Sequence, residues 1–364
     1  MPLSQFKPEQ YDQLLNDKVA TTRALFDDVA MPEAEVFASD KQYYRMRTEF
    51  KVWHQDDELY YVMFNPAAAK KPVRVDSFPV AGEAINTLMP VLIEELKSST
   101  TLRHRLFQVE FLSTLAGDML VTLIYHRQLD DQWISEATAL KKRLGIDIIG
   151  RARKMKICLD RDFVIEKLPL SLGEFSYKQV EGGFTQPNAK MNCSMINWAV
   201  DASKDNGGDL VELYCGNGNF TLPLSRQFDK VLATEISKTS VHSAQYNIAE
   251  NNIDNLTIIR MSSEEFTQAL NGEREFRRLK GVDLDSYQFS TVLVDPPRAG
   301  LDSETVKLVQ RFDNILYVSC NPHTLAENLT TINQTHEVVK LAFFDQFPYT
   351  HHMETGVYLK RRDS

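Results

Sequence analysis

The chain has 364 residues, of which 43% are hydrophobic, so it is long enough for two or three domains with sizeable cores and is neither disordered nor fibrous. With 41 Lys and Arg against 50 Asp and Glu, its formal net charge is −9, which excludes a generally basic nucleic-acid coat. Its four cysteines offer no disulfide framework and no metal-ligand spacing, and no apolar run is long enough to cross a membrane. We therefore expect a cytoplasmic protein without a bound metal or a membrane anchor.

The first half of the chain predicts an α+β module. Alternating hydrophobic residues indicate strands, and two of them flank the turn Leu115-Ala116-Gly117-Asp118 as in a hairpin. A Pro- and Gly-bearing stretch at 168–173 ends this pattern, so we expect one domain at 1–168 and another at 169–364. The expected strands are 43–52, 59–63, 107–114, 119–126 and 147–158, and the expected helices are 84–97 and 131–143.

The second half alternates strands with helices, which is typical of a doubly wound, mainly parallel sheet. The apolar runs that indicate strands are short and bounded by turn residues. The expected strands are 209–213, 231–233, 256–261, 291–294, 315–319, 338–344 and 356–360, and the expected helices are 220–228, 240–251, 303–312 and 324–331.

Basic residues gather in the first half of this acidic chain and alternate with aromatic residues. Seven Lys and Arg accompany a single carboxylate between Lys141 and Lys156. In RNA-binding proteins such cations hold phosphates while aromatic rings stack on exposed bases, although an ordinary solvated surface has the same composition. The candidate RNA contacts are Arg45, Arg47, Phe107, His126, Arg151, Arg153 and Lys154.

A glycine turn in the second half predicts a nucleotide-cofactor site. Gly216-Asn217-Gly218 follows a buried strand and precedes a helix, but it lacks the G-x-G-x-x-G pattern of dinucleotide sites. S-adenosylmethionine has no pyrophosphate, so a shorter turn is adequate for it. Glu235 ends the next strand, where a carboxylate can accept hydrogen bonds from both ribose hydroxyls; a helix cap or a surface carboxylate is the alternative.

Two further residues follow strands whose carboxyl ends should meet at the same sheet edge. Asp295 opens the sequence Asp-Pro-Pro-Arg after the most apolar strand and could hold a pyrimidine edge or the cofactor. Cys320 ends the following strand, just before an expected helix whose dipole would favour a thiolate. Cys320 is therefore a candidate nucleophile, whereas a buried cysteine is more often a small hydrophobic residue.

Five segments together resemble the RNA uracil-5-methyltransferases, the m5U family, and within it the bacterial tRNA enzymes. The likeness runs over nearly the whole chain. It implies a Rossmann-like, S-adenosyl-L-methionine-dependent methyltransferase domain behind an N-terminal α+β RNA-binding domain. The segments are Phe184-Thr-Gln-Pro-Asn188, Glu212-Leu-Tyr-Cys-Gly-Asn-Gly-Asn-Phe220, Asp295-Pro-Pro-Arg298, Ser319-Cys-Asn-Pro322 and Phe344-Asp-Gln-Phe-Pro-Tyr-Thr-His-His-Met-Glu354.

The resemblance also implies roles for individual residues. Cys320 would be the nucleophile that attacks C6 of uracil, and Glu354 the base that removes the C5 proton, with His351 or His352 as a substitute. The residues implied around S-adenosyl-L-methionine and the target base are Gln186, Tyr214, Asn219, Glu235 and Asp295.

The implied partner is tRNA, methylated at uridine 54 of the T-loop, together with the T-loop mimic of transfer-messenger RNA. Relatives that act on ribosomal RNA usually carry an N-terminal oligonucleotide-binding barrel and cysteines for an iron–sulfur cluster, whereas the first 157 residues here contain no cysteine. We therefore expect no such cluster. Three alternatives remain: the same reaction on ribosomal RNA, an RNA-folding factor with secondary catalysis, and a small-molecule methyltransferase, which would leave the first domain without a task.

Overall fold

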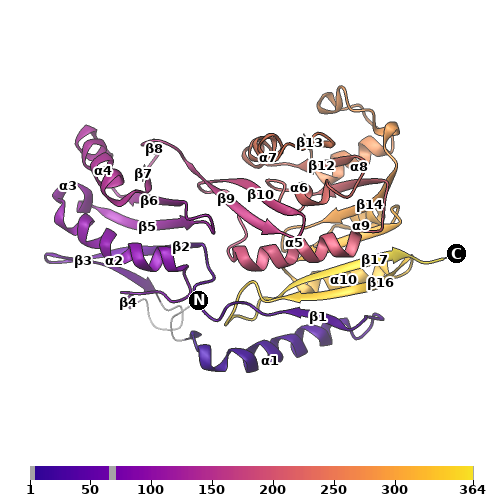
Figure 1. Ribbon diagram of the computed structural model, residues 1–364, viewed down its shortest axis with the longest axis horizontal. Coiled ribbons are helices and arrows are strands. Elements are labelled where there is room, and N and C mark those ends of the chain that lie inside the picture. Colours follow the sequence, from indigo (N-terminus) through magenta and orange to yellow (C-terminus); the bar gives the residue numbers. More distant parts are fainter. Residues whose placement is uncertain (1–4, 65–70, 364) are drawn as a thin grey trace. The chain divides into compact units, whose positions relative to one another are not determined.

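The structure is a computed structural model that describes residues 5–64 and 71–363, and the chain divides into two compact units (Figure 1). Unit 1 comprises Met1–Pro8, Asp40–Lys167 and Gln179–Ala189. Unit 2 comprises Glu9–Ser39, Leu168–Lys178 and Lys190–Ser364.

Unit 1 is built on a seven-stranded sheet. In spatial order its strands are β4 (Pro72–Arg74), β3 (Glu58–Phe64), β2 (Arg47–Gln55), β5 (Leu106–Ser113), β6 (Met119–Tyr125), β7 (Asp147–Ala152) and β8 (Met155–Cys158). Neighbouring strands are antiparallel except β6 and β7, which are parallel. The single strand expected at 147–158 is thus two strands, because Lys154 adopts a left-handed φ of 58° in the turn between them.

Three helices cover one face of this sheet: α2 (Glu83–Ser98) contacts β3 and β5, α4 (Asp131–Leu144) contacts β7, and the short α3 (Thr100–Arg103) contacts both helices. Below α2, the rings of Phe50, Tyr61 and Phe111 pack at centroid distances of 5.5–6.3 Å. Helix α4 begins where the Asp130 side chain accepts a hydrogen bond from the Trp133 amide (2.9 Å) and ends at Gly145, whose φ is 65°. The expected α+β module is confirmed in this unit.

Unit 2 contains an eight-stranded sheet. In spatial order its strands are β1 (Ala34–Phe37), β16 (His336–Phe344), β17 (Glu354–Arg361), β15 (Asn314–Ser319), β14 (Phe289–Val294), β11 (Asp209–Leu213), β12 (Val231–Glu235) and β13 (Leu256–Arg260). The five strands from β15 to β13 are parallel, and β17 runs antiparallel to both of its neighbours. The predicted α/β fold with a mainly parallel sheet is confirmed.

The connections between these strands are helical. Helix α7 contacts β12 and β13, and α8, α9 and α10 pack side by side. The helix expected at 220–228 is one turn only. The helices are α5 (Ala189–Ser203), α6 (Thr221–Leu224), α7 (Lys238–Glu250), α8 (Ser263–Leu270), α9 (Ser303–Val309) and α10 (Pro322–Ile332), with short 3-10 turns at Arg277–Leu279 and Leu284–Ser286.

The N-terminal segment belongs to unit 2, which differs from the single boundary expected after residue 168. Helix α1 (Tyr11–Arg23) leads through a 3-10 turn (Ala24–Phe26) to β1, which pairs in parallel with β16. Figure 1 shows α1 and β1 in indigo beside the yellow β16. The division occurs because β1 pairs with a strand 307 positions later in the chain (Ala34 with Leu341) rather than with its sequence neighbours.

A boundary between the units does fall where the sequence predicts one, between Lys167 and Leu168, but the stretch at 168–173 lies within regular structure. It joins β9 (Phe163–Leu170) and β10 (Gly173–Val180), which form a two-stranded sheet. The Gly173 that marked the boundary adopts a φ of 115°, which fits the tight turn between the two strands.

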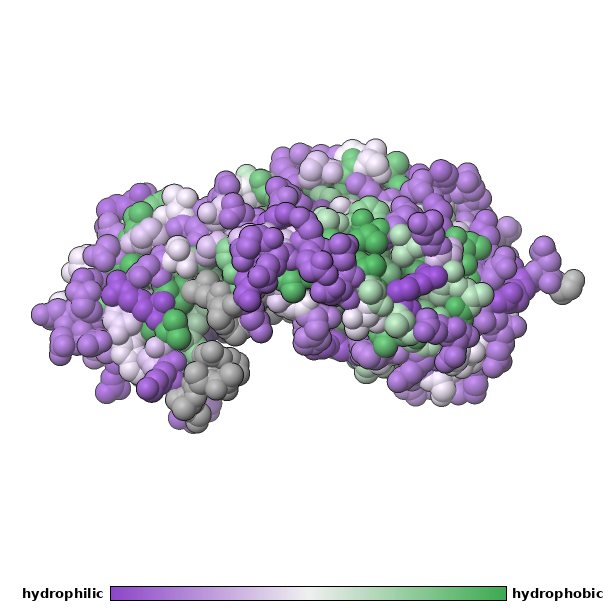
Figure 2. All heavy atoms as spheres, turned by 90° about the horizontal axis from the view of Figure 1, so that it is seen from below, coloured by the Kyte–Doolittle hydropathy of each residue, from purple (hydrophilic) through white to green (hydrophobic). Residues whose placement is uncertain are grey.

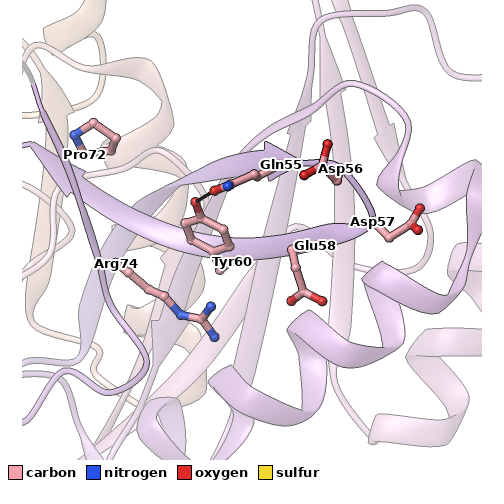
Figure 3. A pocket seen from close by; sticks show the side chains of 7 residues that line it. All are labelled: Gln55, Asp56, Asp57, Glu58, Tyr60, Pro72 and Arg74. Atoms are coloured by element: carbon pink, nitrogen blue, oxygen red, sulfur yellow. Dashed lines mark hydrogen bonds between the residues drawn. The ribbon is translucent and has the colours of Figure 1, made fainter.

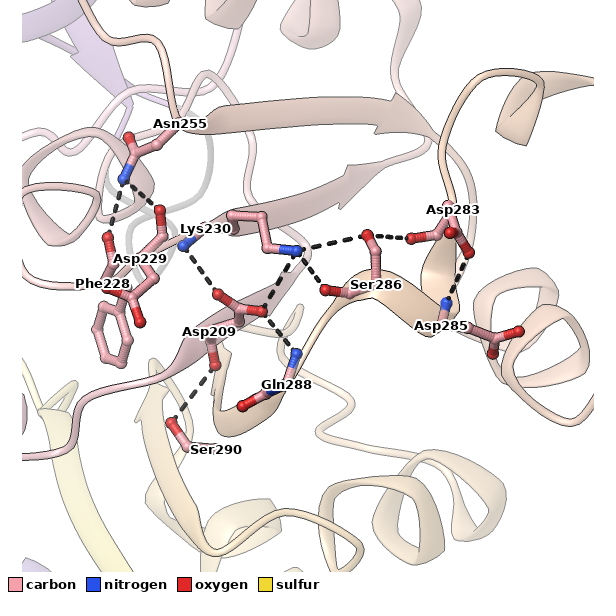
Figure 4. Close-up of polar contacts among 10 residues, drawn as sticks. All are labelled: Asp209, Phe228, Asp229, Lys230, Asn255, Asp283, Asp285, Ser286, Gln288 and Ser290. Atoms are coloured by element: carbon pink, nitrogen blue, oxygen red, sulfur yellow. Dashed lines mark hydrogen bonds and ion pairs between the residues drawn. The ribbon is translucent and has the colours of Figure 1, made fainter.

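A buried carboxylate fixes the amino end of the parallel strands (Figure 4). Asp209 accepts hydrogen bonds from the backbone amides of Lys230 (2.9 Å) and Gln288 (2.6 Å), so it ties the starts of β11, β12 and β14 together. Nearby, the Asn255 side chain donates to the carbonyls of Phe228 (2.9 Å) and Asp229 (3.3 Å). Hydrogen bonds within the protein thus occupy the polar groups at this end of the sheet. The predicted site lies at the opposite end, where the parallel strands finish.

The face of the molecule drawn in Figure 2 is mainly hydrophilic, with hydrophobic side chains in small separate patches. Among residues 5–64 and 71–363, no helix is long and apolar enough to cross a membrane.

Candidate active site

Five of the predicted site residues lie at one edge of the unit 2 sheet. Leu213 pairs with Thr234 of β12 and Val294 of β14, so the residues that follow these strand ends are neighbours. Ser319 of β15 pairs with Thr355 of β17, which sets the start of β17 against the end of β15. The residues that this register brings to the edge are Tyr214, Glu235, Asp295, Cys320 and Glu354.

The glycine turn has the conformation that its sequence requires. Gly216 and Gly218 have φ values of 58° and 87°, and Tyr214 has a φ of 63°, which L-residues adopt at a cost. A Cβ on Gly218 would lie 2.1 Å from Cδ1 of Leu222, whereas a Cβ on Gly216 would meet nothing within 4 Å. The turn is thus closely packed against Leu222 of α6 at Gly218, and it leaves space beside Gly216.

Glu235 joins this turn to the end of β12. Its Oε2 accepts a hydrogen bond from the Gly216 amide (3.0 Å), and its Oε1 accepts one from the Ser237 amide (2.6 Å). Because each carboxylate oxygen has two lone pairs, both oxygens can still accept a hydroxyl.

Tyr214 and Asn219 are held by polar contacts on opposite sides of the turn. The Tyr214 hydroxyl lies 2.8 Å from the hydroxyl of Ser263 at the start of α8. Asn219 and Asn192 of α5 form a reciprocal amide pair with two bonds of 2.8 Å. Ser263 and Asn192 were not predicted, because neither stands in a motif and only the fold brings them to the turn.

The two expected catalytic residues, Cys320 and Glu354, and the neighbouring Asp295 carry raised pKa values. Burial raises the pKa of Asp295 to about 7. Burial, and then the Asp295 carboxyl, raise the pKa of Glu354 to about 8, and this residue is only 4% exposed. Burial and both carboxyls raise the pKa of Cys320 to about 11.

The thiol of Cys320 is therefore not the favoured thiolate that its sequence context predicted. Helix α10 does begin two residues later, capped by Asn321, but burial and the carboxyls of Glu354 and Asp295 raise the pKa of this thiol. Arg298 acts in the other direction, since its positive charge lowers the pKa of both Cys320 and Glu354. The Arg298 carbonyl accepts a hydrogen bond from the Asn321 side chain (2.9 Å), so the Pro-Pro-Arg loop and the Cys320 segment are joined.

Gln186 lies in a segment of unit 1 and is partly buried. This segment is attached to β2 and the residue before it: Arg47 Nη1 donates to the Gly183 carbonyl (2.8 Å), and the Met46 amide donates to the Pro187 carbonyl (2.7 Å). Phe184, within the same segment, is 76% exposed. Arg47, which we expected to contact RNA, thus makes a hydrogen bond within the protein that holds this segment against β2.

Phe107 and His126 form an aromatic platform on unit 1. Their rings stack at a centroid distance of 4.0 Å and an interplanar angle of 23°, and Lys51 Nζ lies 3.8 Å from the centroid of Phe107. His126 is exposed. A cation beside stacked, accessible rings is an arrangement that can bind a base and a phosphate together.

The basic stretch 141–156 is largely neutralised by ion pairs. Arg151 forms two bonds to Glu181 (2.6 and 2.5 Å), and Lys156 contacts both Glu181 (3.3 Å) and Asp162 (2.7 Å). Arg153 and Lys154 are exposed in the β7–β8 turn and have no ion pair within the described chain. Within the described chain, the exposed cations of this stretch that have no ion pair are thus Arg153 and Lys154 in this turn and Lys142 in α4.

A pocket at the β2–β3 hairpin has none of these residues in its lining (Figure 3). Its Arg74 is paired with Asp76 (2.7 Å) and its Glu58 with Lys97 (2.8 Å). In the part of the chain that the structure describes, no group of His, Cys, Asp or Glu could hold a metal ion. The pocket is lined by Gln55, Asp56, Asp57, Glu58, Tyr60, Pro72 and Arg74.

Comparison with known proteins gives consistent matches. A family model described as tRNA (Uracil-5-)-methyltransferase matches residues 10–362. Proteins named tRNA/tmRNA (uracil-C(5))-methyltransferase from Vibrio parahaemolyticus and Shewanella amazonensis are each 58% identical to this chain, over 362 and 359 residues, and each alignment covers 98% of both proteins. The crystal structure of Pyrococcus abyssi tRNA (uracil-54, C5)-methyltransferase in complex with S-adenosyl-L-homocysteine has a TM-score of 0.71 at 21% identity, covering 96% of this chain and 83% of that one, which shows a shared fold.

Proposed function

Because this chain belongs to the tRNA (uracil-5-)-methyltransferase family, we propose that it methylates C5 of uridine 54 in the tRNA T-loop with S-adenosyl-L-methionine. The observation that carries the proposal is the meeting of Cys320, Asp295 and Glu354 at one sheet edge, beside the glycine turn. The names of the relatives support tRNA as substrate, and they extend the proposal to transfer-messenger RNA. We propose a cytoplasmic location, where these RNAs are found.

The residues at the edge fit an adenosyl cofactor. Glu235 offers two carboxylate oxygens that can each accept a ribose hydroxyl, and the space above Gly216 is open. The cofactor, when bound, supplies an electrophilic methyl group on a sulfonium. The residues that we propose to hold it are Gln186, Tyr214, Asn219, Glu235 and Asp295.

Cys320 makes C5 of uracil nucleophilic. As its thiol loses the proton, the sulfur electron pair forms a bond to C6, and the C5–C6 π electrons move onto the O4 enolate. C5 can then attack the methyl group, which uracil itself does poorly. The pKa of about 11 means that the free protein holds Cys320 as a thiol at neutral pH, so the thiolate forms only as the base is attacked.

Glu354 completes the reaction. Its carboxylate takes the proton from C5, the C5–H electron pair restores the C5–C6 double bond, and Cys320 leaves with the electrons of its bond to C6. The reaction releases one proton overall. With a pKa of about 8, part of the Glu354 population is a carboxylate at physiological pH, and this form accepts the C5 proton.

Unit 1 would bind the RNA, because its stacked pair Phe107 and His126 and its exposed Arg153 and Lys154 suit bases and phosphates. The uridine must be flipped out of the folded T-loop before Cys320 can reach C6. This binding also accommodates a tRNA-folding role beside methylation, but the names of the relatives do not favour ribosomal RNA or folding alone.

Methyl transfer from labelled cofactor to unmodified tRNA, followed by mapping of the modified nucleotide, tests the proposal. Cys320→Ala should bind tRNA but form no covalent adduct, and Glu354→Gln should accumulate a methylated adduct that survives denaturing electrophoresis. Cys158→Ala and Glu337→Gln, at exposed positions, are the matched controls and should behave as the unchanged protein. An adduct on any other cysteine, or label on ribosomal RNA alone, contradicts the proposal.

A further inference from the structure

A buried lysine of the N-terminal helix holds the loop that precedes Glu354. This loop, residues 345–353, joins β16 to β17. Lys18 Nζ donates to the Asp345 carboxylate at the start of the loop, to the Phe347 carbonyl (3.2 Å) within it, and to the His352 carbonyl (3.1 Å) near its end. One ammonium group thus uses its three donors on three points of the same loop.

The contact is buried, which makes it costly to break. The side chains of Lys18 and Asp345 are 8% and 1% exposed. Burial lowers the pKa of Lys18, and the adjacent Asp345 opposes that change, so the charged pair depends on its own mutual contact. Removal of the lysine would leave a buried carboxylate and two loop carbonyls without this donor.

Tyr11 and β1 reinforce the start of the loop. The Tyr11 hydroxyl donates to Asp345 Oδ2 (2.8 Å) and accepts a hydrogen bond from the Ser39 amide (2.7 Å), while its ring packs edge-on against Tyr349 at 5.7 Å. The Asp345 amide donates to the Phe37 carbonyl (3.0 Å). The segment 9–39 therefore forms one wall of this loop, with Lys18 at its centre.

We propose that Lys18 is a positioning residue for the final proton abstraction: it fixes the loop 345–353 so that Glu354 faces C5 of the bound uracil. The inference rests on the proposed function. Glu354 is the first residue of β17 and pairs with Phe344, the last residue of β16. Because the loop joins these two residues, a displacement of the loop would also move the Glu354 carboxylate.

The Cys320 segment has hydrogen bonds of its own and meets the loop 345–353 only indirectly among the described contacts, through Arg298, whose Nη2 lies 3.4 Å from His352 Nδ1. Ser319 Oγ accepts a hydrogen bond from the Asn321 amide (3.2 Å), and Asn321 in turn bonds the Arg298 carbonyl. Among the described contacts, Lys18 makes no hydrogen bond to Ser319, Asn321 or Arg298. Loss of Lys18 should therefore slow proton abstraction more than it slows addition and methyl transfer.

The test compares two rates in Lys18→Met, that of labelled adduct formation and that of elimination. It uses the full-length protein, unmodified tRNA and labelled cofactor. We expect elimination to slow by about 10- to 100-fold, as a small misplacement of a catalytic group can do, while the rate of labelled adduct formation changes much less. The methylated RNA–protein adduct should then accumulate. Lys307→Met, at an exposed lysine paired only with Glu304 of its own helix, should leave the partition unchanged.

Equal losses in both steps, with no additional adduct, would mean that Lys18 serves stability alone and would overturn the inference. If Lys18→Met does not fold, Asp345→Asn provides the test, since it removes the negative charge from one of the three attachments and should still raise the adduct fraction, though less. An unchanged partition in a folded Asp345→Asn also overturns it. Failure of the proposed function is distinguishable, because the unchanged protein would then form no Cys320-linked methylated RNA.

Discussion

Ionisation of Glu354 should control the stability of unit 2 even without RNA. The unfolded chain ionises this residue near the ordinary pKa of 4.5, whereas burial keeps it protonated in the folded protein up to a pKa of about 8. Between these values the folded state holds a proton that the unfolded state has released, so stability falls as the pH rises through this window. The full pKa difference corresponds to about 5 kcal/mol lost above pH 8.

Glu354→Gln keeps the shape of the side chain and removes the ionisation. We expect the variant to exceed the unchanged protein in stability by about 2–5 kcal/mol at pH 9, and to match it within about 1 kcal/mol at pH 5, because burying the amide offsets part of the gain. For a unit of this size, the melting temperature at pH 9 should rise by at least about 4 °C.

The measurement is thermal unfolding of both proteins at pH 5 and pH 9, with Glu337→Gln as the control for a surface carboxylate. The control should show no such pH-dependent difference. If Glu354→Gln changes the melting temperature equally at the two pH values, the folded protein does not hold the extra proton, and the argument from burial is refuted.

Three further predictions concern single features of the site. Glu235→Gln should weaken S-adenosyl-L-methionine binding by about 1–3 kcal/mol in calorimetry, because the amide replaces an acceptor with a donor; unchanged affinity would remove Glu235 from the site. Neutralising Arg153 and Lys154 should lower tRNA affinity and reduce the log–log salt slope by about 0.7–0.9 for each lost phosphate contact, whereas Arg151→Ala should change the slope little because Arg151 is paired. Iodoacetamide alkylation of Cys320, located by mass spectrometry, should accelerate about tenfold per pH unit between pH 7 and 10, and a plateau below pH 8 would contradict the raised pKa of about 11.

The sequence by itself predicted the parallel strands of the central sheet and placed candidate site residues at one edge of it. Buried parallel strands read as continuous apolar runs, so Val292–Val294 and Ile315–Val318 stand out without knowledge of the fold. Because the carboxyl ends of parallel strands meet at one edge, Glu235, Asp295 and Cys320 could be assigned to one site from their positions after these runs.

The N-terminal segment could not be placed in this way. Strand β1 has only four residues, with Glu35 and Val36 exposed, so it carries no hydrophobic alternation. Its pairing with β16, and the bond from Lys18 to Asp345 over 327 positions, exist only once the sheet is assembled.

Only the tertiary structure decided the charge states. Arg151 is a cation in a basic stretch by sequence, yet Glu181 neutralises it in the fold. Cys320 stands before a helix by sequence, yet burial, and then the carboxyls of Glu354 and Asp295, raise its pKa. Strand patterns depend on neighbouring residues and survive in the sequence, whereas a pKa depends on burial and on charges that folding brings from distant positions.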